Sequence, residues 1–510
     1  MLTKILSVAS IGLKSQEVEV EVDVAEKGLP GVTIVGLPSK AIEESRERVK
    51  TAINNSGGTF PAKKITINLA PADLPKEGSC YDLPMAVGIL AASGEVEVKK
   101  EMLASFFYGE LSLDGSLRHT RGSLLVALLA KKRGVSRIYV PKVSAAEAAA
   151  VEGVEVVGVS SLLELVAIML GQKQAEIVKP REVAGEEERE VDFDMAEVIG
   201  QESAKRAMVI AAAGGHNIIM SGPPGSGKTL LSRALPGILP PLEPEEALEV
   251  TKIYSVAGLI DPGKGLVDVR PFRSPHHTTS AVGIIGGGSI PMPGEVSLAH
   301  LGVLFLDEMA EFSKFVLEVL RQPMEDGKVS ISRAAGRVDF PAEFMLVAAV
   351  NPCPCGWLGH PKRECRCSPF QVIKYKRKIS GPILDRIDLQ VRVEAVEIEK
   401  LTREGVSGGE DSKTLRGRVV SARKIQLKRF TGEKQLWCNA RMNNRQIKKF
   451  CQLKPEAMRI LKLAAEKFDM SARSYFRVIK VARTISDLSG HTDIEMVDVA
   501  EALQYRMSDI

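Results

Sequence analysis

The chain has 510 residues, of which 45% are hydrophobic and 26% are charged, and its formal net charge is +4. This length is too great for a single hydrophobic core, and the composition is that of a globular protein rather than a disordered one. No apolar run approaches the roughly 20 residues of a membrane helix, and residues 1–7 do not resemble a secretory signal, so we expect a cytoplasmic protein without a membrane partner. Because the net charge is small, nucleic-acid binding would depend on local basic patches.

Residues 1–171 are predicted to form a separate α/β domain, because strand-like and helix-like segments alternate there. The first strand candidate alternates apolar and charged residues with period two, as a half-buried strand does. The first helix candidate interleaves charged residues with Ile42, Val49 and Ile53, which is an amphipathic pattern. The expected strands are 17–24, 32–35 and 65–69, and the expected helices are 39–54, 83–92 and 123–132.

Changes in composition delimit the rest of the chain. Residues 172–191 carry charges of both signs and few large apolar side chains, which is typical of an exposed linker, although a solvated helix face has the same pattern. Residues 192–400 are expected to form an α/β core, and the Gly- and Ser-rich residues 401–415 a flexible connection to a helical part at 416–510. Helical spacing in that last part predicts helices at 456–466 and 473–489.

A phosphate-binding loop is the strongest chemical signal in the chain. The motif Gly-x-x-x-x-Gly-Lys-Thr follows a strand candidate at 217–220 and precedes a helix candidate at 229–235, an order that a simple Gly/Pro turn does not require. Its glycines let successive backbone N–H groups face one anion, while Lys228 reaches the β- and γ-phosphates and the Thr229 hydroxyl holds Mg²⁺. The residues predicted to bind ATP are Gly222, Pro223, Pro224, Gly225, Ser226, Gly227, Lys228 and Thr229.

Two apolar runs further along the chain end in polar side chains that suit phosphate hydrolysis. Residues 301–306 are followed by Asp307, predicted to help hold Mg²⁺, and by Glu308, predicted to polarise the attacking water. Residues 344–350 are followed by Asn351, predicted to hydrogen-bond that water. Each could also be a polar residue that ends a surface strand, but together with a phosphate loop they favour an ATPase site.

Four of the seven cysteines lie within fifteen residues, as Cys353, Cys355, Cys365 and Cys367. Two close pairs joined by a short loop favour four thiolates around a structural Zn²⁺, although a one-residue spacing within each pair is unusual. A reduced structural group and a redox switch are the alternatives, and His360 could replace one ligand. The other cysteines, expected to pack as small apolar residues, are Cys80, Cys438 and Cys451.

Four motifs together resemble those of AAA+ ATPases, and more narrowly those of the magnesium-chelatase-like branch known as the YifB or ComM family. They are the phosphate loop, Leu-Phe-Leu-Asp-Glu-Met at 304–309, Ala-Val-Asn-Pro-Cys at 349–353 and Ser-Gly-Pro-Ile-Leu-Asp-Arg-Ile-Asp at 380–388. The resemblance covers essentially the whole chain and implies an α/β AAA+ P-loop NTPase core with a helical C-terminal lid.

The same resemblance places further elements and roles on this sequence. It implies an inserted element at 270–280 and 283–294 and a hairpin around 327–340, both typical of this branch. It makes Arg386 the arginine finger that reaches the nucleotide of a neighbouring subunit, and Arg473 the sensor 2 residue of the lid; either could instead be a surface ion-pair partner. A finger in trans requires a ring, so a homo-hexamer is expected. The hairpin residues expected to contact DNA are Lys328, Arg333 and Arg337.

Residues 61–142 resemble the catalytic domain of Lon protease, which has the ribosomal protein S5 domain 2-like fold, through residues 74–78, 109–115 and 140–142. Lon uses a Ser-Lys dyad in which the lysine activates the serine. The nucleophile position falls on Cys80 and the lysine position near Val126, where there is no base, so no peptidase activity is expected. A scaffold or DNA-contacting role is favoured instead.

The likeness leaves three kinds of work for such a motor. ComM-type proteins are DNA helicases that drive branch migration in recombination, which implies single-stranded or branched DNA as partner, in natural transformation or repair. Residues 362–378 agree, because seven basic residues stand against one acidic residue, with Phe370 and Tyr375 between them, although a solvated surface has the same composition. Metal insertion, as in magnesium chelatase, and protein remodelling are the alternatives. Chelatase requires separate large subunits, and remodelling motors typically present an aromatic pore loop, which residues 283–290 lack.

Overall fold

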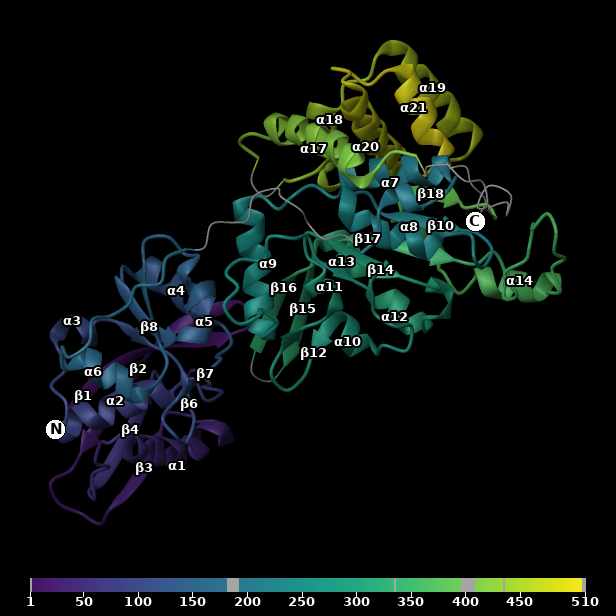
Figure 1. Cartoon of the computed structure of the whole chain (residues 1–510). Coiled ribbons are helices and arrows are strands. Elements are labelled where there is room, and N and C mark those ends of the chain that lie inside the picture. Colours follow the sequence, from purple (N-terminus) through teal and green to yellow (C-terminus); the bar gives the residue numbers. More distant parts are fainter. Residues whose placement is uncertain (1, 181–191, 334–335, 396–408, 434–435, 507–510) are drawn as a thin grey trace.

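The computed structural model describes residues 2–180, 192–333, 336–395, 409–433 and 436–506. Figure 1 shows an N-terminal α/β lobe, a central α/β core and a layer of C-terminal helices on the core. The N-terminal lobe has its own hydrophobic core, while a second core joins one face of the central sheet to the C-terminal helices and a third covers the other face. Residues 181–191 of the expected linker and 401–408 of the expected connection lie outside the described residues.

The N-terminal lobe is built on a mixed sheet of seven strands. The expected strand at 17–24 is confirmed within β2, whose alternate side chains are buried because only one face of this hairpin strand packs on the core. In spatial order the strands are β3 (Gly31–Val35), β4 (Lys64–Ala70), β2 (Lys14–Val24), β1 (Leu2–Ile11), β5 (Phe106–Phe107), β8 (Arg137–Pro141) and β9 (Glu155–Val159).

Helices cover this sheet and confirm the three expected ones. The second helix is buried almost along its whole length and approaches the sheet so closely that a Cβ on Gly88 would lie 2.6 Å from Val22 Cγ2. A glycine there allows helix and strand to touch. The elements are α1 (Lys40–Asn55), α2 (Asp82–Ser93), α3 (Lys100–Leu103), α4 (Ser123–Arg133), α5 (Lys142–Ala149), α6 (Leu162–Met169) and the short pair β6 (Glu110–Leu111) and β7 (Leu117–Arg118).

The central sheet brings the predicted catalytic segments side by side. Its five strands are parallel, so the residues that follow each strand meet at one edge of the sheet. Both faces are covered, which is why the three inner strands are buried along their whole length. In spatial order they are β11 (Phe272–Arg273), β14 (Val303–Leu306), β17 (Met345–Val350), β10 (Ile218–Ser221) and β18 (Leu389–Arg392).

The edge strand β11 corrects one expectation. Residues 270–280 are expected in the inserted element, but Phe272 and Arg273 pair with β14 as part of the central sheet. The physical reason is packing across the strands, since the Phe272 and Phe305 rings stack 5.9 Å apart. The inserted element is therefore confined to the chain that follows β11.

The other elements of the core lie on the two faces of the sheet and at its rim. The expected hairpin around 327–340 is present as β15 and β16. The helices are α7 (Glu202–Gly214), α8 (Lys228–Ala234), α9 (Pro244–Ala257), α10 (Ala281–Ile285), α11 (Glu295–Leu298), α12 (Lys314–Val319), α13 (Arg321–Asp326), α14 (Pro369–Lys376) and α15 (Gly381–Leu384), and the hairpins are β12 (Gly286–Gly287) with β13 (Met292–Pro293) and β15 (Lys328–Arg333) with β16 (Gly336–Pro341).

The C-terminal helices pack on α7 and confirm both helices expected from spacing. The first begins at Ser412, capped by Asp411, so the expected boundary at residue 415 falls inside it. None of the helices in the described ranges is both long and apolar enough to cross a membrane. The helices are α17 (Ser412–Arg429), α18 (Asn444–Phe450), α19 (Pro455–Lys467), α20 (Ala472–Ser489) and α21 (Met496–Gln504).

Among the described residues, the N-terminal lobe contacts the core at the turn between β1 and β2 and along α9 and the residues that follow it. The turn between β1 and β2 lies on β16, where a Cβ on Gly12 would come within 2.2 Å of Val338 Cγ1. At the second contact, the Gly122 N–H donates to the Ser255 carbonyl at 3.2 Å, and the Ser255 hydroxyl donates to Glu147 at 3.3 Å.

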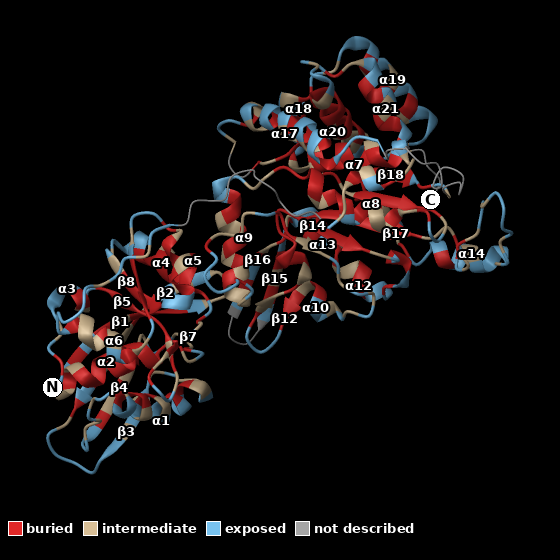
Figure 2. Ribbon diagram, in the orientation of Figure 1, coloured by how far each residue is buried: buried red, intermediate tan, exposed pale blue. Residues whose placement is uncertain are grey.

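At the opposite end of the core, Figure 2 shows that α14 and the loop before it are largely exposed.

Candidate active site

The loop between β10 and α8 has a backbone that its glycines make possible. Gly225 and Gly227 have φ of +75° and +92°, in the left-handed region that favours glycine. A Cβ on Gly222 would lie 2.1 Å from the Val393 carbonyl oxygen, so the loop can begin this close to the chain after β18 only with glycine. These are the backbone requirements of a loop that turns its N–H groups toward an anion.

Lys228 is held inside this loop. Its Nζ donates to the carbonyl oxygens of Gly222 and Pro223, both at 2.8 Å. Burial lowers the pKa of Lys228 to about 8, although the nearby Asp307 and Glu308 act in the opposite direction. An ammonium group whose charged form is destabilised by burial gains from a nearby phosphate, which supplies the missing negative charge.

The side chains of Thr229 and Asp307 bring two oxygen atoms together. The Thr229 hydroxyl donates to Asp307 Oδ2 at 3.0 Å, and the Glu308 N–H donates to Asp307 Oδ1 at 3.0 Å. Neighbouring oxygens of an octahedral Mg²⁺ lie about 2.9 Å apart, so the spacing fits this ion. Glu308 is exposed and has a φ of +48°, an unusual conformation for glutamate that occurs often at functional sites.

Asn351 lies at the same edge of the sheet, directly after β17. This strand pairs with β10 on one side and β14 on the other, so Asn351 sits between the phosphate loop and Asp307.

Tyr375, a neighbour of Asn351 in space, corrects one expectation. Tyr375 is 6% exposed and packs in the hydrophobic core, and burial raises its pKa to about 12, so it does not offer a ring to a nucleic acid, whereas Phe370 is 73% exposed.

The two arginines assigned by resemblance lie together but away from their own phosphate loop. Arg386 is buried, donates to the Pro382 carbonyl at 2.7 Å and forms an ion pair with Glu325. Arg473 of α20 donates to the other oxygen of Glu325 at 2.7 Å. In the described structure neither guanidinium bonds to Lys228, Thr229, Asp307 or Glu308. One chain therefore supplies the loop and carboxylates at one place and the arginines at another.

Sequence reasoning missed the residues that hold the backbone of Arg386. The Asn217 side chain and Arg477 Nη1 both donate to the Arg386 carbonyl at 2.9 Å. Arg477 also pairs with buried Asp388, which accepts the Asn217 N–H at 3.0 Å. Burial would raise the pKa of Asp388, but Arg477 and His216 hold it well below its usual value. Asp388 lies in the quoted motif at 380–388, and its position two residues after Arg386 was the available signal.

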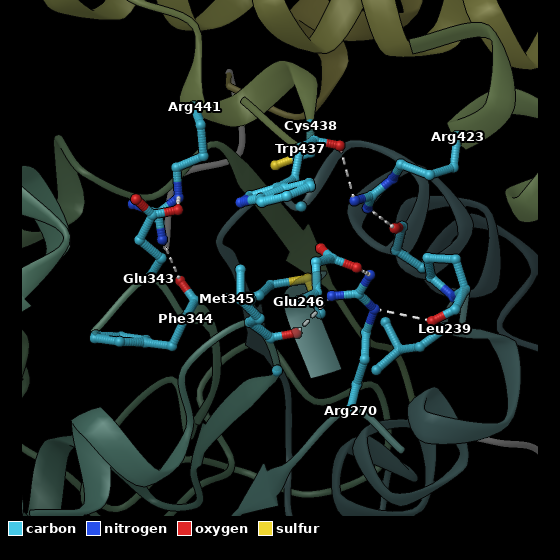
Figure 3. Close-up of a pocket in the computed structure, with 15 residues that line it drawn as sticks. Leu239, Glu246, Arg270, Glu343, Phe344, Met345, Arg423, Trp437, Cys438 and Arg441 are labelled. Atoms are coloured by element: carbon cyan, nitrogen blue, oxygen red, sulfur yellow. Dashed lines mark hydrogen bonds and ion pairs between the residues drawn. The ribbon is translucent and has the colours of Figure 1, made fainter. Parts of the chain in front are cut away.

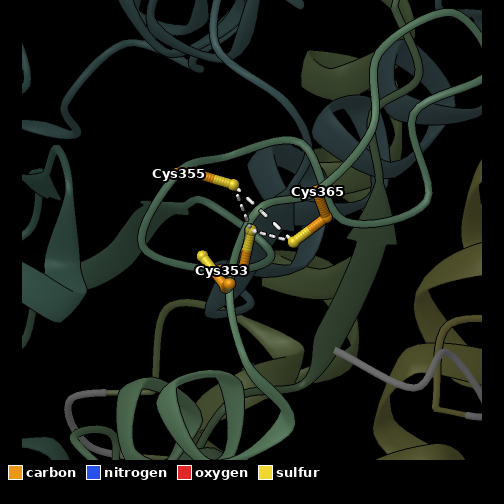
Figure 4. Close-up of side chains that lie close together, drawn as sticks. Cys353, Cys355 and Cys365 are labelled. Carbon is orange, nitrogen blue, oxygen red and sulfur yellow. Dashed lines mark hydrogen bonds between the residues drawn. The ribbon is translucent and has the colours of Figure 1, made fainter.

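The four clustered cysteines converge on one point, as Figure 4 shows for three labelled sulfurs. The Sγ atoms of Cys353, Cys355 and Cys365 lie 3.4–3.6 Å apart, and all four sulfurs lie within 4.8 Å of one another. Tetrahedral Zn²⁺ with bonds of 2.3 Å separates its sulfurs by about 3.8 Å, whereas a disulfide requires about 2.05 Å. The cluster therefore has the dimensions of a metal site.

His360 does not join this cluster. Its Nδ1 accepts the N–H groups of Lys362 and Arg363, at 3.1 and 3.0 Å, so it shapes the loop between the cysteine pairs. The loop also packs on the phosphate loop, because a Cβ on Gly356 would lie 2.5 Å from Pro224 Cδ. The cysteine cluster is thus part of the wall of the candidate nucleotide site.

The hairpin residues expected to contact DNA are only partly free. Lys328 Nζ lies 4.0 Å from Asp339, and Arg337 bonds to Asp339 and Ser330 at 3.4 and 3.0 Å. Both basic side chains are more than half exposed, but they share one carboxylate. The side chain of Arg333 lies outside the described residues.

The isolated cysteines are buried, as expected. Burial raises the pKa of Cys80 to about 12, so its thiol stays protonated near neutral pH. Val126, near which the resemblance to Lon places the lysine, is fully buried. The N-terminal lobe therefore offers neither an activated nucleophile nor a base at the aligned positions.

A small pocket at the opposite edge of the central sheet is not a second anion site (Figure 3). Its volume is about 50 Å³, and its arginines already have partners. Arg270 bonds to Glu246 at 2.6 Å, Arg423 donates to the Ala212 and Ala213 carbonyls, and Arg441 donates to the Phe344 carbonyl at 3.0 Å. The Arg423 and Arg441 contacts join the C-terminal part to the core, whereas the Arg270–Glu246 pair lies within the core.

Comparison with known proteins finds similar proteins over nearly the whole chain. The family descriptions "Magnesium chelatase, subunit ChlI", "Subunit ChlI of Mg-chelatase" and "Magnesium chelatase, subunit ChlI C-terminal" match residues 194–401, 20–144 and 409–506. Competence protein ComM of Haemophilus influenzae is 42% identical over 509 residues, which is 98% of this chain and 97% of ComM. The uncharacterised protein YifB of Escherichia coli K12 is 42% identical over 502 residues, or 98% and 96% of the two chains.

A weaker similarity, 27% identity over 222 residues, links 38% of this chain with 37% of Lon protease 2 of Bacillus subtilis. The α/β AAA+ fold class expected from the motifs is confirmed by the magnesium chelatase match, the central parallel sheet and the helical C-terminal part. ComM and YifB, by contrast, align with nearly the full length of this chain, at an identity that similar folds alone do not produce. The chain therefore belongs to the ComM/YifB family of magnesium-chelatase-like AAA+ proteins.

Proposed function

We propose that the protein hydrolyses ATP at the edge of its central sheet. The observation that carries this proposal is the 3.0 Å contact of Thr229 with Asp307, next to Lys228 in its glycine loop. Bound Mg²⁺ would neutralise charge on the β- and γ-phosphates. Thr229 and Asp307 have the oxygen spacing to hold it, and Lys228 binds the phosphates.

Glu308 and Asn351 act on the attacking water. Both follow strands that end at the phosphate loop, and the exposed Glu308 carboxylate can accept a proton from a water in front of the γ-phosphate. Asn351 fixes the direction of that water by a hydrogen bond. Since phosphoryl transfer needs mainly positioning and charge stabilisation, these residues account for the chemistry on one subunit.

Arg386 and Arg473 complete the site from a neighbouring subunit. Their position on Glu325, away from their own loop, supports a role in trans. A guanidinium brought to the transferring phosphoryl group stabilises its developing charge. A site shared between subunits implies a closed ring, and we propose a homo-hexamer.

The proposed substrate of the ring is single-stranded or branched DNA, and the work is helicase-driven branch migration in recombination during transformation or repair, in the cytoplasm. The name of the relative ComM, a competence protein, supports this. The exposed basic surface around α14 also supports DNA as the substrate, because Phe370 is available there for base stacking. The paired basic residues of the β15–β16 hairpin give further support.

The test is the ATPase rate with and without single-stranded and forked DNA at two salt concentrations. We expect stimulation by DNA, and Lys328→Ala with Arg337→Ala should reduce the slope of log affinity against log salt by about two. Replacing the exposed Lys462 of α19 with Ala is the matched control. Absence of both stimulation and salt-dependent binding would contradict the DNA motor. Stimulation by unfolded protein would support remodelling, and stimulation by a metal-free porphyrin with partner subunits would support metal insertion.

We also propose that the cysteine cluster holds a structural Zn²⁺. Four sulfur ligands leave no open position for a reactive water, so the role is structural. Metal analysis of the native protein should find about one Zn²⁺ per chain, lost in Cys365→Ser but retained in Cys438→Ser. Iron in place of zinc would change the metal assignment, and a metal-free native protein would contradict the site.

A further inference from the structure

A single carboxylate joins the two arginines assigned to catalysis. Glu325, near the end of α13, accepts one bond from Arg386 of the core and one from Arg473 of the C-terminal helices. The Arg386 side chain is 8% exposed, whereas those of Glu325 and Arg473 are about half exposed, at 47% and 49%. Glu325 therefore forms the outer surface over a buried guanidinium.

The arrangement is rigid on the side away from solvent. Arg473 and Arg477 lie four residues apart on α20, so they share one face of that helix. Arg477 donates to the Arg386 carbonyl, and Asn217 of the core donates to the same oxygen. The C-terminal helix thus fixes the Arg386 backbone and delivers Arg473 to the same carboxylate.

Arg386 also has an unused donor. Its buried Nε has no hydrogen-bond partner in the described structure. A buried donor without a partner costs free energy, which a new acceptor would recover. The Glu325 carboxylate is charged near neutral pH, as an ordinary glutamate is, and its hydrogen bond with Arg386 lowers its pKa further.

We propose that Glu325 is a positioning residue that holds Arg386 and Arg473 together in the free subunit, and that the nucleotide phosphates of a neighbouring subunit replace its carboxylate on ring assembly. Guanidinium groups bind carboxylate and phosphate oxygens in the same forked geometry, so the exchange keeps the arginines where they are. The carboxylate competes with the incoming phosphates, so the ring assembles with ATP only at a higher protein concentration than it would without Glu325. This inference rests on the proposed ATPase ring.

Glu325→Gln tests the exchange, because it removes the negative charge and keeps the shape. We expect the protein concentration at half-maximal ATPase rate to fall about three- to tenfold, because this change in affinity corresponds to the free energy of one or two partly exposed ion pairs. The maximal rate per subunit should stay within about twofold, since Arg386 and Arg473 remain. Glu325→Asp, which keeps the charge, should stay close to the native protein.

Glu318→Gln is the matched control. Glu318 and Glu325 line one cavity beside α12 and α13, but the ion pair of Glu318 is with Arg321 at 2.6 Å. An equal shift in Glu318→Gln would show a general charge effect and overturn the role of Glu325. A lower melting temperature with reduced activity at every concentration would show a purely structural role, which also overturns it.

The failure of this inference is distinguishable from failure of the ring. If the native rate per subunit does not rise with protein concentration, the shared site is wrong. If the native rate does rise and Glu325→Gln has the same midpoint, only the exchange at Glu325 is wrong. Light scattering of the same samples with ATP reports assembly independently of turnover.

Discussion

The central core and the N-terminal lobe each bury a lysine whose ammonium donates to backbone carbonyls, Lys228 to Gly222 and Pro223, and Lys76 to Pro71. Burial lowers the pKa of both. Their surroundings differ. Lys228 lies beside Asp307 and Glu308 at the mouth of a glycine loop, whereas Lys76 is 1% exposed and the opposing charge that acts on it is that of Asp73.

The difference shows that an α/β sheet does not by itself create a reactive site. In the core, three neighbouring parallel strands deliver loop, carboxylates and amide to one edge. In the lobe, charged groups pair with one another, since Arg48 forms an ion pair with buried Asp82 at 2.9 Å. The Cys80 thiol is buried as well. We therefore expect substitutions in the core to change turnover and those in the lobe to change stability.

The largest effect should come from Arg386→Ala, with a loss of about 10³-fold or more in ATP turnover, because transition-state charge on the neighbour's phosphate loses its guanidinium. The measurement is the steady-state rate at saturating protein. Mixing Arg386→Ala with Lys228→Ala should restore part of the rate, since the second variant still supplies Arg386 to an intact loop. No recovery on mixing would contradict a site shared between subunits.

Lys228→Ala should reduce turnover by at least about 10²-fold through the loss of one charged donor to the phosphates. Nucleotide binding, followed with a fluorescent ATP analogue, should weaken in parallel. Near-normal turnover would mean that the glycine loop is not the catalytic site and would remove the distinction between the two lysines.

A smaller effect is expected from pH. The folded pKa of Lys228, about 8, is below the ordinary lysine value, so the ammonium that a phosphate needs is lost as the pH rises through 8. ATP affinity should therefore fall about tenfold between about pH 7 and about pH 9. Lys228→Arg, which stays charged, should flatten this profile. An equally steep profile in that variant would assign the titration to another group.

The smallest effect on turnover is expected for Lys76→Met. The side chain keeps its length but leaves the Pro71 carbonyl without its donor, at a cost of about 1–3 kcal/mol of unfolding free energy. The ATPase rate should stay within about twofold, and the change should be visible in thermal or urea unfolding. A large loss of turnover at unchanged stability would break the comparison, since it would give the N-terminal lobe a direct part in catalysis.

Much of the site was predictable because its signals are local. A strand, a glycine loop and a helix are consecutive in the chain, as are an apolar run and the polar residue that ends it, so residues 222–229, Asp307 and Asn351 could be proposed from spacing. The expected helices and strands of the N-terminal lobe were found for the same reason. Tyr375 was misjudged, because basic neighbours in sequence do not reveal that its ring packs inward.

Local sequence patterns were thus enough for the phosphate loop and for the strands that carry the carboxylates, since propensity and hydrophobic period act over a few residues. The family was recognised from the resemblance of four motifs. The meeting of Arg386 and Arg473 on Glu325, 61 and 148 residues away along the chain, depended on the packing of the C-terminal helices against the core. So did the membership of β11 in the central sheet and the contact of the cysteine loop with Pro224. Such contacts join residues that no local pattern relates, and only close packing of the whole chain determines them.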